Sequence, residues 1–87
     1  MTVISIGEEC HGDIGIAKDL ESAKDLLFKE GWIDECTDIF NDDEEWLPIN
    51  EVLGSDWKAK VLNMTLKEFN EIFEDRFYLE VIEVYGT

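Results

Sequence analysis

Basic residues are scarce in this chain. Its 87 residues include only 7 lysines and arginines against 22 aspartates and glutamates, which gives a formal net charge of −15. A surface of this sign repels nucleic acid and anionic membranes and attracts basic proteins. We therefore expect no direct binding to nucleic acid or membranes, and a protein partner with a basic surface.

Long apolar runs and targeting segments are also missing. No stretch approaches the roughly 20 apolar residues of a membrane span. The N-terminal segment MTVISIGEE lacks the basic and apolar regions of a signal peptide, so we expect a cytoplasmic protein. Cys10 and Cys36 are then most simply free thiols, and a functional disulfide is the alternative.

Catalytic signatures are absent as well. His11 is the only histidine, which excludes any scheme that needs two. Gly12 and Gly15 lack the third glycine of a dinucleotide fingerprint, and no Gly-Lys-Ser/Thr is present for a phosphate loop. The 34–38 segment begins like a calcium loop, but Ile39 occupies the position where such loops need glycine. We expect no enzyme activity, no catalytic residues and no cofactor.

One loop combines several residue types that can bind metals. It contains Glu8, Glu9, Cys10, His11 and Asp13 around a turn at Gly12. A tight loop rarely directs all such side chains inward, and no second ligand pair has a characteristic spacing. We therefore expect no metal site.

Hydrophobic periodicity predicts a single α+β domain over residues 1–87. We expect a mostly antiparallel sheet of about five strands with three helices, in the order β-β-α-β-β-α-α-β. The strands are expected at residues 2–7, 13–17, 37–40, 45–49 and 77–85. The last of these, FYLEVIEVY, is almost continuously apolar, which predicts a central strand buried on both faces.

Capping residues define two of the helices. Asp19 is expected to cap the first, whose lysines would lie on or beside a mixed-charge outer face, and Gly31 suits the left-handed position after its end. Thr65 and Glu68 form the pattern of a capping box at the start of the last helix. Pro48 is expected to open a short helical turn before these later helices.

A long acidic segment occupies the middle of the chain. Residues 31–57 contain no lysine or arginine. Their nine acids are Asp34, Glu35, Asp38, Asp42, Asp43, Glu44, Glu45, Glu51 and Asp56. Apolar residues are interleaved with these acids, which argues against a disordered tail and predicts a hairpin with its turn at residues 41–44. Trp32 and Trp46 are expected to anchor this hairpin by burying their rings.

A second acidic surface is expected on the last helix. Its apolar residues fall on one side, and the acids Glu68, Glu71, Glu74 and Asp75 fall on the other. The simplest interpretation of both acidic regions is a solvated surface that keeps the protein soluble. The functional interpretation is that they attract a groove lined by lysine and arginine.

In size and charge, and in the segments IDECTDIFNDDEEW and EFNEIFED, the chain resembles the small acidic proteins of phages and mobile elements that inhibit nucleic-acid-handling enzymes by mimicking nucleic acid. Anti-restriction, anti-CRISPR and glycosylase-inhibitor proteins belong to this class. The resemblance includes no shared motif, so it assigns no residue a role. It implies a non-enzymatic, inhibitor-like binding protein whose partner offers a basic site.

These observations lead to one leading hypothesis and one alternative. The leading hypothesis is a binding protein whose acidic side chains contact a basic protein surface. The candidate partner-binding residues are Asp34, Glu35, Asp38, Asp42, Asp43, Glu44, Glu45, Glu68, Glu71, Glu74 and Asp75. The alternative is a partner-binding or assembly module that uses apolar surface around Trp46, Trp57 or Tyr78, with the acidity serving only solubility.

Overall fold

A computed structural model describes residues 2–41, 43–74 and 76–84 of the chain and shows a small α+β fold. Asp42 and Asp75, both predicted site residues, lie outside the described residues. The elements are β1 (Thr2–Glu8), β2 (Gly12–Ala17), α1 (Leu20–Lys29), β3 (Asp38–Phe40), β4 (Trp46–Pro48), α2 (Ile49–Leu53), α3 (Trp57–Leu62), α4 (Leu66–Ile72) and β5 (Phe77–Glu83).

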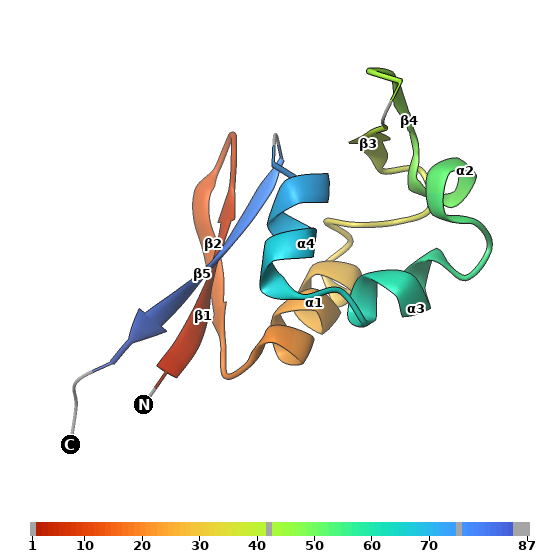
Figure 1. Ribbon diagram of the computed structural model, residues 1–87. Coiled ribbons are helices and arrows are strands. Elements are labelled where there is room, and N and C mark those ends of the chain that lie inside the picture. The colour runs from red at the N-terminus through yellow and green to blue at the C-terminus, as the bar shows by residue number, and fades with distance from the viewer. Residues whose placement is uncertain (1, 42, 75, 85–87) are drawn as a thin grey trace.

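The described strands form two antiparallel sheets rather than one. The larger has the order β2-β1-β5, and the smaller is the hairpin of β3 and β4. Helices α1 and α4 cover one face of the larger sheet, and the hairpin lies beyond the helices, away from that sheet (Figure 1). The predicted order omitted α2, because the short helical turn expected after Pro48 is long enough to be a fourth helix.

The prediction that β5 is central and buried on both faces is wrong. It is an edge strand that pairs with β1, and only Phe77 and Leu79 are buried along it. The strand extends beyond the short helix α4, so its C-terminal half has no helix above it (Figure 1). Val81, on the same face as Phe77 and Leu79, is consequently exposed despite its apolar character, and Ile82 points to the opposite face.

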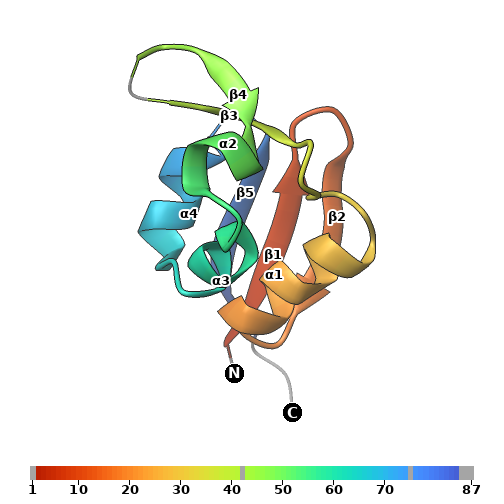
Figure 2. The same ribbon diagram turned by 90° about the vertical axis from the view of Figure 1, so that its right-hand side faces the viewer.

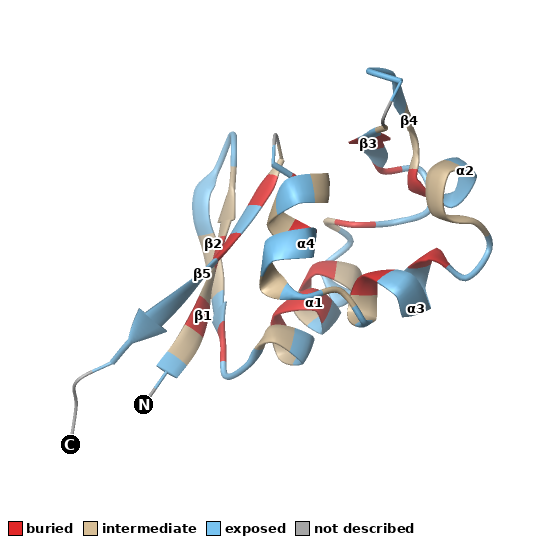
Figure 3. Cartoon of the chain, viewed as in Figure 1, coloured by how far each residue is buried: buried red, intermediate tan, exposed pale blue. Residues whose placement is uncertain are grey.

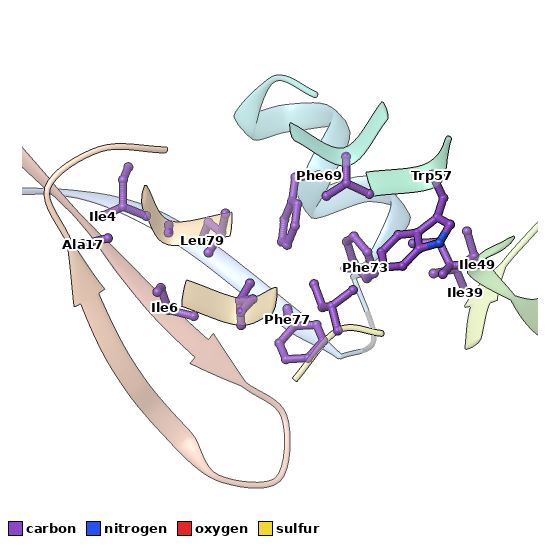
Figure 4. Close-up of a cluster of buried hydrophobic side chains, with 14 residues drawn as sticks. Ile4, Ile6, Ala17, Ile39, Ile49, Trp57, Phe69, Phe73, Phe77 and Leu79 are labelled. Atoms are coloured by element: carbon purple, nitrogen blue, oxygen red, sulfur yellow. The ribbon is translucent and has the colours of Figure 1, made fainter. Parts of the chain in front are cut away.

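The hydrophobic core extends from the sheet to the base of the hairpin. Figure 3 shows buried segments along β1, β5, α1, α3 and α4, with most of the hairpin exposed. In Figure 4, Ile6 lies at the sheet end of the core and Ile39 lies at the hairpin end. Phe73 lies between them, with its ring centroid 4.6 Å from that of Phe69 and 5.9 Å from that of Phe77.

The helix boundaries follow from local hydrogen bonds, as predicted. The Asp19 carboxylate accepts from the Ser22 N–H at 2.8 Å. The α1 helix ends in a Schellman motif, because Trp32 N–H donates to the Leu27 carbonyl and Gly31 adopts a φ of 77°. The capping box of Thr65 and Glu68 is also present.

Lys24 is buried, contrary to the expected exposed position on α1. It is only 1% exposed and lies between Ala23 and Leu27 on the apolar side of the helix. Its ammonium donates to the carbonyls of Leu62 (3.1 Å), the last residue of α3, and Met64 (2.5 Å), two residues beyond it. A cation there satisfies carbonyls that the helix leaves without partners. Burial lowers the pKa of Lys24, and Glu68 and Glu21 oppose this shift.

We predict that Lys24→Ala lowers the free energy of unfolding by about 2–4 kcal/mol, because it removes the buried stem and leaves two carbonyls without a donor. Lys24→Met keeps most of the stem and should cost less. Lys18→Ala, at an exposed position just before α1, should change stability by no more than about 0.5 kcal/mol. Urea denaturation of the three variants is the measurement. Equal stability of Lys24→Ala and Lys18→Ala would contradict the buried role of Lys24.

Candidate functional site

The loop of the β3–β4 hairpin is held in place by Asn41. The Asn41 side-chain oxygen accepts from the N–H groups of Asp43 (2.9 Å) and Glu45 (3.0 Å). The Asn41 backbone donates to the Glu45 carbonyl and accepts from the Glu44 N–H. These bonds satisfy the loop backbone locally and leave the side chains of Asp43, Glu44 and Glu45 exposed.

These exposed carboxylates have no cationic partner within the described part of the chain. The ion pairs recorded there are His11 with Glu8 and Lys60 with Asp56. The loop therefore carries uncompensated negative charge. Glu44 also has a φ of 62°, a conformation that costs a non-glycine residue of order 1 kcal/mol.

Two aromatic rings lie beside this acidic loop. Phe40 and Trp46 are paired across the hairpin, with ring centroids 5.3 Å apart. Phe40 is 41% exposed and Trp46 is 47% exposed, so the prediction that Trp46 anchors the hairpin through a buried ring is wrong. Side chains alternate between the two faces of a strand, and Ile39 takes the buried face. Phe40, which sequence analysis did not select, follows Ile39 and therefore points to the exposed face.

Trp32 packs beside the turn between β1 and β2 and the start of β5. Its ring is half-buried and makes edge contacts with His11 at 5.2 Å and Phe77 at 6.3 Å between centroids. It thus packs against the larger sheet rather than anchoring the hairpin. Trp57 is only 8% exposed, which removes it from the apolar surface that the alternative hypothesis proposed.

The predicted acids at residues 34–38 are divided between structural and exposed positions. One carboxylate oxygen of Asp34 accepts from the Cys36 N–H at 2.9 Å and from the Thr37 hydroxyl at 3.4 Å. Asp34 and Glu35 also line a hollow that includes Lys58, so a base is near them. Asp38 is exposed on β3, the first strand of the hairpin.

The predicted acidic surface on α4 is divided between two places. The helix ends at Ile72, so Glu74 lies beyond it and lines a separate hollow with Glu8 and Arg76. Glu68 and Glu71 instead border a groove that faces the hairpin. The Glu68 carboxylate accepts from the Thr65 N–H in the capping box, and the Thr65 backbone and hydroxyl lower the pKa of Glu68.

This groove joins the hairpin to α4 and has a volume of about 430 Å³. Its apolar lining comes from β3, α2, the connection between α3 and α4, and α4, and its acidic lining comes from α4. The lining includes Phe40, Val52, Met64 and Ile72 together with Glu68 and Glu71. Figure 2 shows the hairpin projecting beyond α2, above the end of α4. The groove therefore places two of the predicted α4 acids opposite Phe40 and Asn41 of the hairpin, across an apolar floor.

The loop that sequence analysis considered for metal binding has its main carboxylate engaged. Glu8 accepts from the N–H groups of Cys10 (3.0 Å) and His11 (2.9 Å) and bonds the His11 ring at 2.5 Å. Among the described residues, no group of three or more potential ligands is placed to hold a metal ion. Cys10 and Cys36 are exposed free thiols.

We predict a pH-dependent contribution of Glu8 to stability. The hydrogen bond from His11 is the largest cause that lowers the Glu8 pKa, and the two backbone N–H bonds add to it. Because the folded-state pKa lies below the ordinary 4.5, this stabilisation is present above pH 4.5 and is lost as the pH falls through the folded-state value. Glu8→Gln should therefore lower stability most at neutral pH, and its effect should shrink in acid.

Urea denaturation of the Glu8→Gln variant between neutral and acidic pH tests this prediction. Glu9→Gln is the matched control, because Glu9 is the adjacent exposed carboxylate and its side chain accepts no recorded hydrogen bond within the described ranges. A Glu8→Gln effect of the same size at every pH would show that the carboxylate charge is not what stabilises the loop.

No helix in the described part of the chain has the length and apolar character needed to cross a membrane. No known protein family, curated protein or solved structure matches the chain.

Proposed function

We propose that this protein is a non-enzymatic, inhibitor-like binding protein whose β3–β4 hairpin occupies a basic site on a protein partner. The observation that carries the proposal is the hydrogen-bonded arrangement of Asn41 with residues 43–45 of the loop. Its described carboxylates are exposed on a backbone that is held by hydrogen bonds to Asn41, and they have no cationic partner among the described residues.

Charge repulsion supports this proposal over a purely solubilising role. Carboxylates held close together on a fixed loop repel one another and cost stability, and a partner rich in lysine and arginine relieves that cost on binding. Solubility needs only a dispersed negative charge. The Asn41 bonds hold the acids on one loop, which is the arrangement that complements a compact basic site.

A basic site that normally binds nucleic acid fits this surface, because it offers lysine and arginine side chains at phosphate spacing. We therefore infer a nucleic-acid-processing enzyme as the class of partner and the cytosol as the location. The described acids that contribute most are Asp43, Glu44 and Glu45, with Asp38 and Glu71 nearby. Asp34 and Glu68 also stabilise local structure, so their contribution to binding is secondary.

A second candidate function has its own observation. The helices leave one face of the larger sheet open (Figure 1). By strand alternation from the buried Ile6 and Leu79, this face carries Ile16 and Tyr78, which are 66% and 57% exposed, with Ile82 at 37%. An open apolar sheet face is a common site of protein association. Of the three aromatic residues named for the apolar alternative, Tyr78 belongs to this face and Trp46 belongs to the hairpin.

We predict that replacing Asp42, Asp43, Glu44 and Glu45 by their amides sharply weakens partner binding and leaves the fold intact. Exposed substitutions usually change stability by no more than about 0.5 kcal/mol each. The matched control neutralises four exposed acids elsewhere, namely Glu9, Asp13, Asp25 and Glu30. Both variants lose the same charge, so a difference in their affinity for the partner shows the effect of where the charge lies rather than of the net charge.

The measurement is capture of the partner from a host lysate, followed by titration of the purified partner at low and high salt. The wild-type protein and the control variant should bind with a steep salt dependence, because screening shortens the range of the field to about 8 Å at physiological ionic strength. If the loop variant binds with wild-type affinity and an unchanged salt slope, the electrostatic hypothesis is wrong. Loss of binding in a Tyr78→Ser variant alone would favour the open sheet face.

A further inference from the structure

The groove between the hairpin and α4 combines an apolar floor with acidic borders. Phe40 is 41% exposed and forms part of one wall, and Val52, Met64 and Ile72 are only partly buried against the core. Glu68 and Glu71 border the α4 side. On the hairpin side, Asn41 lines the groove, and the acidic loop follows it directly.

We propose that this groove receives an apolar side chain of the partner, carried on a segment in which lysine or arginine residues flank it. The inference rests on the proposed function and deepens it. Binding then has two components, a charge contact at the acidic borders and an apolar contact on the floor. Pure mimicry of a phosphate backbone needs only the first component, because phosphates have no apolar group to place between the carboxylates.

Charge complementarity favours a basic segment of the partner over the other possible occupants of the groove. A second copy of this chain would bring another net charge of −15 to a groove that is already bordered by carboxylates. An acidic or uncharged apolar segment would desolvate Glu68 and Glu71 without neutralising them, which costs free energy. A basic segment neutralises the borders while its apolar residue fills the floor.

The volume of the groove suits this occupant. About 430 Å³ is enough space for one or two large side chains rather than for a folded domain. Burial of one such side chain corresponds to an affinity gain of roughly tenfold to a hundredfold. The apolar contact therefore adds measurably to the electrostatic attraction without replacing it.

Two synthetic peptides of equal length and equal lysine content provide the probe. One carries leucine between its lysines, and the other carries serine at the same positions. We expect the leucine peptide to bind wild-type protein at least about tenfold more tightly. We also expect it to shift the backbone amide resonances of Asn41, Val52 and Ile72 in a ¹⁵N-labelled sample. Both peptides should bind more weakly as salt rises.

Phe40→Ser should remove the preference for leucine while leaving the affinity for the serine peptide unchanged. Tyr78→Ser is the matched control, because it removes an exposed aromatic ring away from the groove and should preserve the preference. The resonance map uses wild-type protein, so it tests the location of binding even if a variant unfolds.

The outcomes separate the two proposals. Salt-dependent binding of both peptides with equal affinity would overturn the groove inference and leave the proposed function standing. A leucine preference that persists in Phe40→Ser, with shifts at Ile16 and Tyr78, would also overturn it and would locate the apolar contact on the open sheet face. Failure of both peptides to bind at low salt would contradict both proposals.

Discussion

The fold depends on Phe73, which connects the two ends of the core. Its ring lies between those of Phe69 and Phe77, and it is only 2% exposed. Through Phe77 the core continues under the larger sheet, and buried residues such as Ile39 and Ile49 continue it to the base of the hairpin (Figure 4). A small body with a net charge of −15 loses stability to self-repulsion. A continuous apolar core offsets this loss, so the charged loop can project without its own core.

Three of the few basic residues support the packing of the helices rather than the hairpin loop. Lys24 is buried, and its ammonium satisfies carbonyls at the end of α3, so it contributes little to neutralising the surface. Lys60 donates to the Leu53 carbonyl at 2.6 Å and pairs with Asp56, which stabilises the connection between α2 and α3. Lys58 lies near the rings of Phe28 and Trp57. Each of these bases supports packing near the helices, and the hairpin loop carries no base of its own.

Sequence analysis succeeded where structure depends on neighbouring residues. The Asp19 cap, the Schellman motif at Gly31 and the capping box of Thr65 and Glu68 each involve residues within five positions of one another, so their side-chain chemistry is sufficient. Predictions that required knowledge of distant neighbours failed. The apolar run at Phe77–Glu83 suggested a central strand, but only tertiary structure shows that α4 is too short to cover it. Lys24 appeared exposed because its carbonyl partners lie about 40 positions away.

The composition of the candidate acidic surface was likewise evident from sequence, but its arrangement was not. The run of charge in residues 31–57 identified the hairpin loop. The exposure of Trp46 depends on which face of the hairpin packs against the core, and amino-acid composition does not specify that face. Because α4 ends at Ile72, Glu74 is separated from Glu68 and Glu71. For the proposed binding this division is important, because two acids line the same groove as Phe40 and a third does not. A groove that combines apolar and acidic side chains discriminates among basic partners better than charge alone. Negative charge attracts every cation, whereas the apolar floor adds binding free energy only for a partner side chain that fills it.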